Sequence, residues 1–112
     1  MVADSEMLYV KHILASIEKI EQYVEDVSFK TFLQDNKTQS AVIRELEIIG
    51  EAAKHLSKAF TKHIDLPWQD ITGMRDKLIH DYMGVDPKVV WKTVKINLPE
   101  LKKKLGQELA LR

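Results

Sequence analysis

The sequence contains no cysteine, and only four of its 112 residues are glycine and three are proline. Without cysteine, disulfides, thiolate metal sites and cysteine nucleophiles are excluded, and a reducing compartment, by default the cytoplasm, is the expected location. No stretch approaches the ~20 apolar residues that would cross a bilayer. The opening residues, Met-Val-Ala-Asp-Ser-Glu, lack the basic and apolar regions of a signal peptide. We therefore expect a cytoplasmic protein without a membrane association.

An excess of one charge is also missing, because seventeen basic residues balance seventeen acidic ones. The charges are unevenly distributed along the chain. Residues 1–35 hold seven acidic and three basic residues, a net charge of −4, whereas residues 86–112 hold three acidic and seven basic residues, a net charge of +4. One end of the molecule can therefore face a polyanion while the whole chain stays neutral.

The composition predicts one folded domain over residues 1–112, because 45% of the residues are hydrophobic and the length suits a single core. β-Branched residues do not alternate with polar ones, which leaves helical periodicity as the only regular pattern. The expected helices cover residues 5–25, 29–35, 42–60, 67–82 and 87–105. These lengths and short connections predict an all-α fold, an antiparallel bundle of four to five helices.

Two details of these helices are predicted by particular residues. Apolar residues of the range 42–60 step by four and three, which indicates one uninterrupted helix with a single buried face. Gly50 in this range predicts the close approach of a neighbouring backbone. Pro99 lacks the amide hydrogen that would bond the Lys95 carbonyl, so the last helix should kink near Pro99.

The chemistry of the chain is concentrated in one segment, Arg75-Asp76-Lys77-Leu78-Ile79-His80-Asp81-Tyr82. The guanidinium of Arg75 can bind phosphate oxygens through its planar fork. The imidazole of His80 can take a proton from a ribose 2′-hydroxyl or give one to the leaving oxygen near neutral pH. Together they would suit RNA cleavage without a metal, although His80 could equally be a helix cap or an ion-pair partner of Asp76.

Helix geometry limits what one copy can do with this pair. Residues five apart lie ~140° apart around an ideal helix, so Arg75 and His80 flank one side without sharing a stripe. A homodimer paired across this helix would bring a second Arg75 and His80 into the same groove. We therefore expect an RNA-cleaving site that is complete only in a homodimer.

The segment Gly73 to Asp86 resembles the signature of the HEPN superfamily, and more narrowly that of the HepT toxins encoded beside a minimal nucleotidyltransferase (MNT) antitoxin. Further similarity lies in Ile-Ile-Gly-Glu-Ala-Ala at 48–53, Pro-Trp at 67–68, Val-Trp at 90–91 and Leu-Pro at 98–99, so that the resemblance covers most of residues 42–101.

The resemblance implies a dimeric, metal-independent endoribonuclease with Arg75 and His80 as the catalytic pair, and neither a metal nor a cofactor is expected. It also implies that the antitoxin transfers AMP to Tyr82, which would block the cleft with bulk and negative charge. Asp76, Lys77 and Asp81 would support the site. Asp76 departs from the Asn common in such proteins, and its carboxylate would repel phosphate unless a neighbouring cation neutralises it.

Other charged residues are candidates either for binding or for ordinary structural roles. Lys88, Lys92 and Lys95 share one helix face at i, i+4 and i+7 and are candidates for contact with RNA phosphates, although such a row is usually a solvated face; Lys102, Lys103 and Lys104 extend it. We expect no aromatic residue to interleave with these lysines, so base stacking is not predicted.

The remaining polar and aromatic candidates have weaker signals. Glu51 and His55 stand at i, i+4 and are expected to form a solvated pair, because a di-iron bundle needs Glu-x-x-His from two helices. No partner is expected for His12 or His63. The remaining expectations are core positions for Trp68 and Trp91 and a buried site near the dimer groove for Glu45.

The sequence is therefore compatible with three functions. The first is the endoribonuclease toxin. The second is a non-catalytic helical dimer that binds the nucleotidyltransferase or RNA, which Asp76 favours. The third is a four-helix metalloprotein, which would contain iron or manganese.

Overall fold

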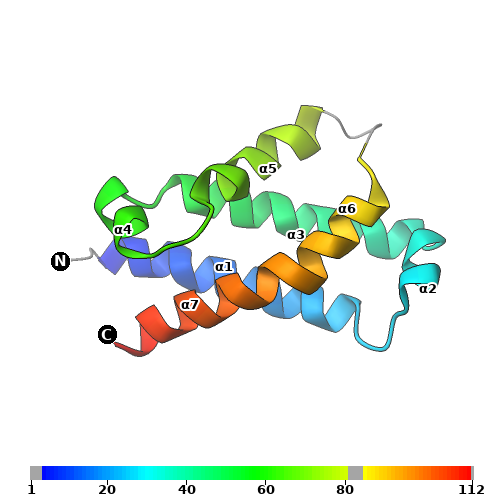
Figure 1. Cartoon of the computed structure of the whole chain (residues 1–112), viewed down its shortest axis with the longest axis horizontal. Coiled ribbons are helices and arrows are strands. Elements are labelled where there is room, and N and C mark those ends of the chain that lie inside the picture. The colour runs from blue at the N-terminus through cyan, green and yellow to red at the C-terminus, as the bar shows by residue number, and fades with distance from the viewer. Residues whose placement is uncertain (1–3, 81–84, 112) are drawn as a thin grey trace.

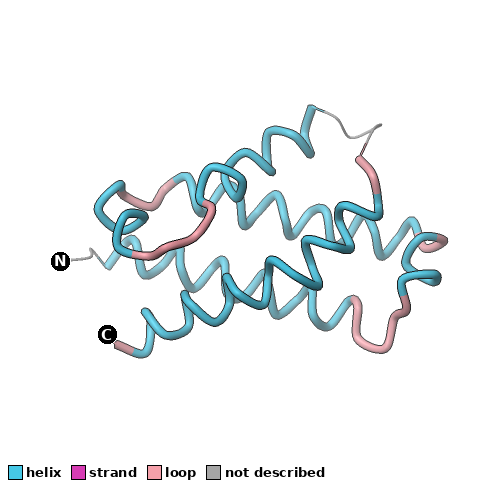
Figure 2. Tube along the Cα trace, in the orientation of Figure 1, coloured by secondary structure: helices cyan, strands magenta, loops and turns pink. Residues whose placement is uncertain are grey.

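The computed structural model describes the backbone of residues 4–80 and 85–111 and the side chains of residues 5–74 and 85–111. These residues form seven α-helices and one π-helical segment: α1 (Asp4–Tyr23), α2 (Phe29–Leu33), α3 (Asn36–Lys54), α4 (Lys58–His63), α5 (Trp68–His80), α6 (Pro87–Lys92), η1 (Thr93–Asn97) and α7 (Leu98–Ala110). The described part of the chain contains no strand (Figure 2). The predicted all-α bundle is confirmed.

The long helices run antiparallel along the molecule (Figure 1). α3 packs against both α1 and α5, and α7 packs against α1. The short helices α4 and α2 lie at opposite ends of the molecule (Figure 1), with α4 at the end that holds both termini and α2 at the other end, beside α6. No described helix is long and apolar enough to cross a membrane.

The core lies between α1 and α3 and is closed by α7. Its least exposed large side chains are Phe32, Phe60, Ile13, Ile17, Ile20, Leu46, Ile49, Leu105, Val10 and Val42. On α1 these residues recur every three or four positions, so that one stripe of the helix is buried. Gly50, Ala52 and Ala53 are also buried on α3. These small side chains occupy little space where α3 packs between α1 and α5.

The predicted helix over residues 42–60 is wrong in its last part. α3 ends at Lys54, and α4 begins a separate helix at Lys58. The Ser57 hydroxyl accepts from the Phe60 amide at 3.1 Å, and the Ser57 amide donates to the Glu6 carboxylate of α1. This carboxylate contact satisfies a backbone donor at the break, and the new helix turns Phe60 back into the core.

The last helix is irregular just before Pro99, where a kink was expected. The helix from Pro87 to Ala110 continues through the π-helical segment η1, in which the Leu98 amide donates to the Thr93 carbonyl five residues back. The Lys95 carbonyl would be the α-helical partner of residue 99, and proline has no amide hydrogen to donate. The wider π turn accommodates this loss within a continuous helix.

Several helices begin at side-chain caps that the sequence supplies. The Asp35 carboxylate accepts from the Thr38 amide at 3.1 Å at the start of α3. Hydrogen bonds from the Thr38 hydroxyl and amide lower the pKa of Asp35 below its usual value, because both favour the charged carboxylate. Ser28 and Asp86 cap α2 and α6 in the same way.

Candidate functional site

α5 carries most of the ionisable segment. Arg75, Asp76, Lys77 and His80 belong to the backbone of α5, while Asp81 and Tyr82 lie outside the described residues. The side chains from residue 75 to residue 84 are likewise outside the described part. The predicted α-helix is confirmed as far as His80, so Arg75 and His80 hold the ~140° relation of an ideal helix.

The beginning of α5 is held by contacts around Trp68. The indole nitrogen of Trp68 donates to the Ile64 carbonyl at 2.9 Å, and the ring lies edge-on to Phe60 with 6.4 Å between centroids. Trp68, Ile71 and Met74 pack against the core at intervals of three residues. This row fixes the rotation of α5 about its axis.

α3 supplies the neighbouring surface of α5, and on α3 Glu45 is 5% exposed. One carboxylate oxygen, Oε1, has no hydrogen-bond partner within the described part of the structure. The predicted burial of Glu45 is confirmed. A buried carboxylate oxygen without a donor destabilises the fold by about 1–3 kcal/mol.

Glu45→Met is therefore expected to raise the melting temperature by several degrees, because it replaces a buried carboxylate, one oxygen of which has no partner among the described residues, with an apolar side chain of similar volume. Thermal unfolding followed by circular dichroism measures the change, and Glu18→Met on the exposed face of α1 is the control. A lower melting temperature for Glu45→Met would mean that the carboxylate is compensated in the assembled protein.

Comparison with known proteins decides the family of the chain. The model of a family described as Ribonuclease HepT-like matches residues 13–107. The chain belongs to this HepT-like family. A Thermococcus cleftensis protein named as a probable ribonuclease HepT is 52% identical over 97 residues, 86% of this chain and 88% of the relative.

Two further relatives of this HepT-like chain have names that propose an RNase activity. One, from Caldanaerobacter subterraneus subsp. tengcongensis, is 45% identical over 102 residues, 90% of this chain and 91% of the relative. The other, from Methanocaldococcus jannaschii, is 41% identical over 96 residues, 85% of this chain and 83% of the relative. No solved structure matches the chain significantly. The resemblance inferred from the motif is confirmed.

The three lysines predicted to contact RNA are exposed on the helix that follows the motif of this HepT-like chain. The prediction that no aromatic residue accompanies them is wrong, because the Lys95 ammonium lies 4.8 Å from the centroid of the Trp91 ring. Trp91 is half-buried and also contacts Phe32, with 5.0 Å between centroids. The i, i+4 spacing of Trp91 and Lys95 was the signal for this contact.

The lysines of α7 are less available than their sequence suggests. The Lys102 ammonium donates to the Glu21 carboxylate of α1 at 2.9 Å, and this pair raises the pKa of Lys102. The Lys104 ammonium lies 3.2 Å from Glu100 and donates to the Asp65 carbonyl. Part of the basic run is therefore neutralised within the molecule.

Two histidines outside the motif have partners. His55 lies 3.7 Å from Glu51, with both side chains about half exposed, as predicted for a solvated pair; the Tyr9 ring stacks on His55 at 4.6 Å. The prediction that His63 has no acidic partner is wrong, because its Nε2 atom lies 3.3 Å from the buried Glu108 of α7. This pair joins residues 45 apart in the chain, and local spacing gave no signal for it.

The described residues contain no group of three His, Asp or Glu side chains that could hold a metal ion. The donor set of a di-iron bundle is therefore not found in that part of the HepT-like chain, including around Glu51 and His55.

Proposed function

We propose that this protein is the toxin of a toxin–antitoxin pair, a homodimeric endoribonuclease that cleaves RNA without a metal and is neutralised by an MNT-type nucleotidyltransferase. The observation that carries the proposal is the Arg75-x4-His80 motif on α5 of a chain from the HepT-like ribonuclease family. The relatives named as RNases support the reaction, and the motif supplies residues suited to it.

The proposed reaction is transfer of the phosphodiester to the neighbouring ribose hydroxyl. The imidazole of His80 takes the proton of the 2′-hydroxyl, whose oxygen forms a bond to phosphorus as the bond to the 5′-oxygen breaks. The imidazolium then gives up this proton, directly or through water, to the leaving 5′-oxygen, which yields a 2′,3′-cyclic phosphate and a 5′-hydroxyl and leaves His80 neutral again. The Arg75 guanidinium would hold the phosphate oxygens and stabilise the charge that develops on them.

Helical periodicity supports a site shared by two copies. Ile71 packs against the core. Position 75 is four residues, about one turn, after Ile71, and position 80 is nine residues after Ile71. Nine residues correspond to 180° around an ideal helix, so position 80 is on the opposite side of α5 from Ile71. Position 75 is only about 40° from Ile71, so one copy does not present positions 75 and 80 on the same side, and a second copy would supply the Arg75 that acts with each His80.

The test of this shared site is complementation between two inactive variants. Arg75→Ala and His80→Ala chains are co-expressed with different tags, and the mixed dimer is purified by both tags. If Arg75 of one copy acts with His80 of the other, the mixed dimer keeps one intact site and cleaves RNA at about half the rate of the wild-type dimer in EDTA.

Each variant by itself serves as the inactive control for this experiment. A mixed dimer as inactive as either parent would contradict the shared site, because a site within one copy cannot be restored by mixing. Cleavage by the wild-type protein that requires added magnesium would contradict the proposal of a metal-independent reaction.

The second candidate function is a non-catalytic dimer that binds RNA or the nucleotidyltransferase. Asp76 favours it, since a carboxylate beside the phosphate-binding Arg75 opposes substrate binding. Wild-type protein that binds RNA but leaves it intact would support this second function.

A further inference from the structure

The end of the molecule formed by α2 and α6 combines exposed aromatic and basic side chains. The Phe29 side chain is 40% exposed, and its ring lies 5.9 Å from that of Trp91. Lys88 and Lys92 are exposed on α6, and the Lys95 ammonium lies against the Trp91 ring. These five residues, Phe29, Lys88, Trp91, Lys92 and Lys95, form the basic–aromatic patch.

The two kinds of side chain in the patch suit the two parts of a nucleotide. Lysine ammonium groups attract phosphates, and an exposed aromatic ring stacks on any base. Phe29 is the first residue of α2, and Trp91 supports its ring from the side of α6. Phe32 is fully buried beneath Trp91, which anchors this pair of rings in the core.

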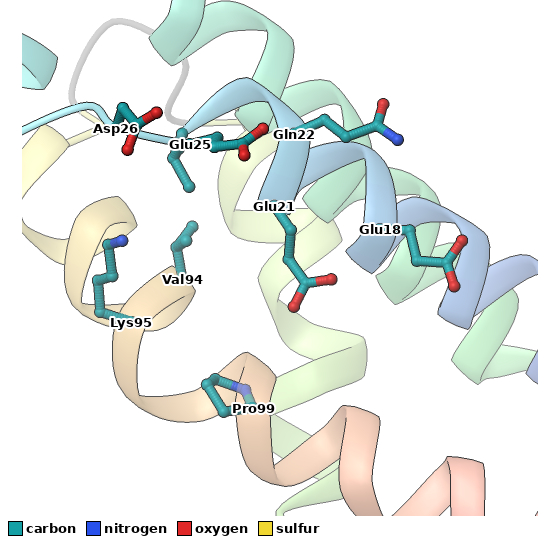
Figure 3. A pocket seen from close by; sticks show the side chains of 9 residues that line it. Glu18, Glu21, Gln22, Glu25, Asp26, Val94, Lys95 and Pro99 are labelled. Carbon is teal, nitrogen blue, oxygen red and sulfur yellow. The ribbon is translucent and has the colours of Figure 1, made fainter.

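An acidic surface limits the patch on one side (Figure 3). A hollow of about 570 Å³ separates α1 from η1 and is lined by Glu18, Glu21, Glu25 and Asp26, with Lys95 at its margin. Glu21 is paired with Lys102, and the other three carboxylates would repel an RNA backbone that continued from Lys95 across the hollow. A bound strand is therefore directed from Lys95 toward Lys92 and Lys88.

Along the chain, that direction leads back toward the motif. Lys88 is eight residues after His80, a distance that the chain spans in at most about 28 Å. The Asp86 carboxylate between them accepts a hydrogen bond from the Lys88 amide as the cap of α6. A strand of a few nucleotides can thus reach from the patch to the proposed cleavage site.

We propose that the basic–aromatic patch binds single-stranded RNA next to the cleavage site, with one base stacked on Phe29 and the phosphates on Lys88, Lys92 and Lys95. This inference rests on the proposed ribonuclease function and adds a binding subsite to it. Through the patch, the enzyme would prefer substrates whose unpaired strand extends several nucleotides beyond the cut.

The test is binding of fluorescein-labelled twelve-nucleotide oligouridylate, followed by fluorescence anisotropy with the His80→Ala protein so that RNA is not consumed. Lys88→Gln, Lys92→Gln and Lys95→Gln are combined in one variant. We expect about 10-fold weaker binding or more, and a slope of log affinity against log salt that is shallower by up to ~2. The matched control combines Lys11→Gln, Lys58→Gln and Lys62→Gln, exposed lysines on α1 and α4 near the other end.

The Phe29→Ala variant distinguishes binding by base stacking from binding by charge attraction. It should weaken oligouridylate binding about 5- to 100-fold and leave the binding of inorganic polyphosphate, which has no bases, unchanged. Glu25→Gln with Asp26→Asn should tighten RNA binding, because the change removes two charges of the acidic hollow. Circular dichroism of each variant confirms that its helices are retained.

Equal RNA binding by the patch variant and the control variant would overturn the patch, even if wild-type protein cleaves RNA. Equal losses of oligouridylate and polyphosphate binding in Phe29→Ala would overturn the stacking role. If binding depends on the patch but wild-type protein cleaves nothing, the patch stands and the proposed ribonuclease function fails.

Discussion

Replacing His80 with alanine is expected to lower the rate of RNA cleavage by about 10²- to 10⁴-fold without unfolding the protein. This range is the usual contribution of a general acid or base, and no neighbouring histidine in the motif can replace it. Arg75→Ala should cost about 10²- to 10³-fold through lost stabilisation of the phosphate charge. Rates are measured with purified protein and total RNA in EDTA.

Controls for this prediction come from the same chain. His12 is an exposed histidine on α1 whose ring meets Tyr9 edge-on, so His12→Ala removes an imidazole outside the motif and should leave the rate unchanged. Arg75→Lys keeps the charge but loses the planar fork, and it should recover only part of the rate. Full activity of His80→Ala in a correctly folded dimer would end the assignment of His80.

Expression in cells provides a second readout of the same variants. Wild-type protein produced without the proposed antitoxin should arrest growth, and His80→Ala should not. Growth arrest by His80→Ala would mean that toxicity comes from binding rather than cleavage, as the non-catalytic function predicts. RNA cleavage and toxicity should therefore fall together across the variants.

The bundle could be predicted from sequence because the information for its helices is local. The periodic stripe of α1, the Pro67-Trp68 start of α5 and the Asp86-Pro87 start of α6 are each contained within a few residues. The irregularity before Pro99 was predictable for the same reason, since a proline fixes which carbonyl loses its donor.

The break between α3 and α4 shows where local patterns fail. Leu56 and Phe60 continue the spacing of the predicted helix, and both are buried. However, Leu56 lies in the connection between the two helices, and Phe60 belongs to α4. The Ser57 amide at the break is satisfied by Glu6, 51 residues away. A contact across that separation leaves no periodic signal in the sequence.

The candidate site also has a part that is local in sequence and a part that depends on contacts between helices. The identities of Arg75 and His80 were read from a short motif, whereas the Phe29, Trp91 and Lys95 contacts depend on how α2 packs beside α6. The pairing of His63 with Glu108 likewise needs α4 and α7 to meet at one end of the bundle. A sequence motif identifies chemical groups within one helix, and the fold determines which groups from other helices lie beside them.

Tyr82→Phe is expected to abolish neutralisation by the nucleotidyltransferase while preserving RNA cleavage. In the proposed modification the phenolic oxygen of Tyr82 attacks the α-phosphorus of ATP, a new oxygen–phosphorus bond forms, and pyrophosphate leaves. Phenylalanine keeps the ring but lacks the oxygen, so no AMP can be attached. Wild-type protein incubated with the partner and ATP should gain the mass of one AMP per chain and lose its ribonuclease activity.

Tyr23→Phe is the matched control, because Tyr23 is 38% exposed at the end of α1 and a tyrosine modified without selectivity would include it. This control should be modified and inhibited as fully as the wild-type protein, as judged by intact mass and RNA cleavage. If Tyr82→Phe also gains AMP, the acceptor is another residue. If wild-type protein is inhibited without a mass change, the partner blocks the cleft by binding, and the added phosphate charge has no part in neutralisation.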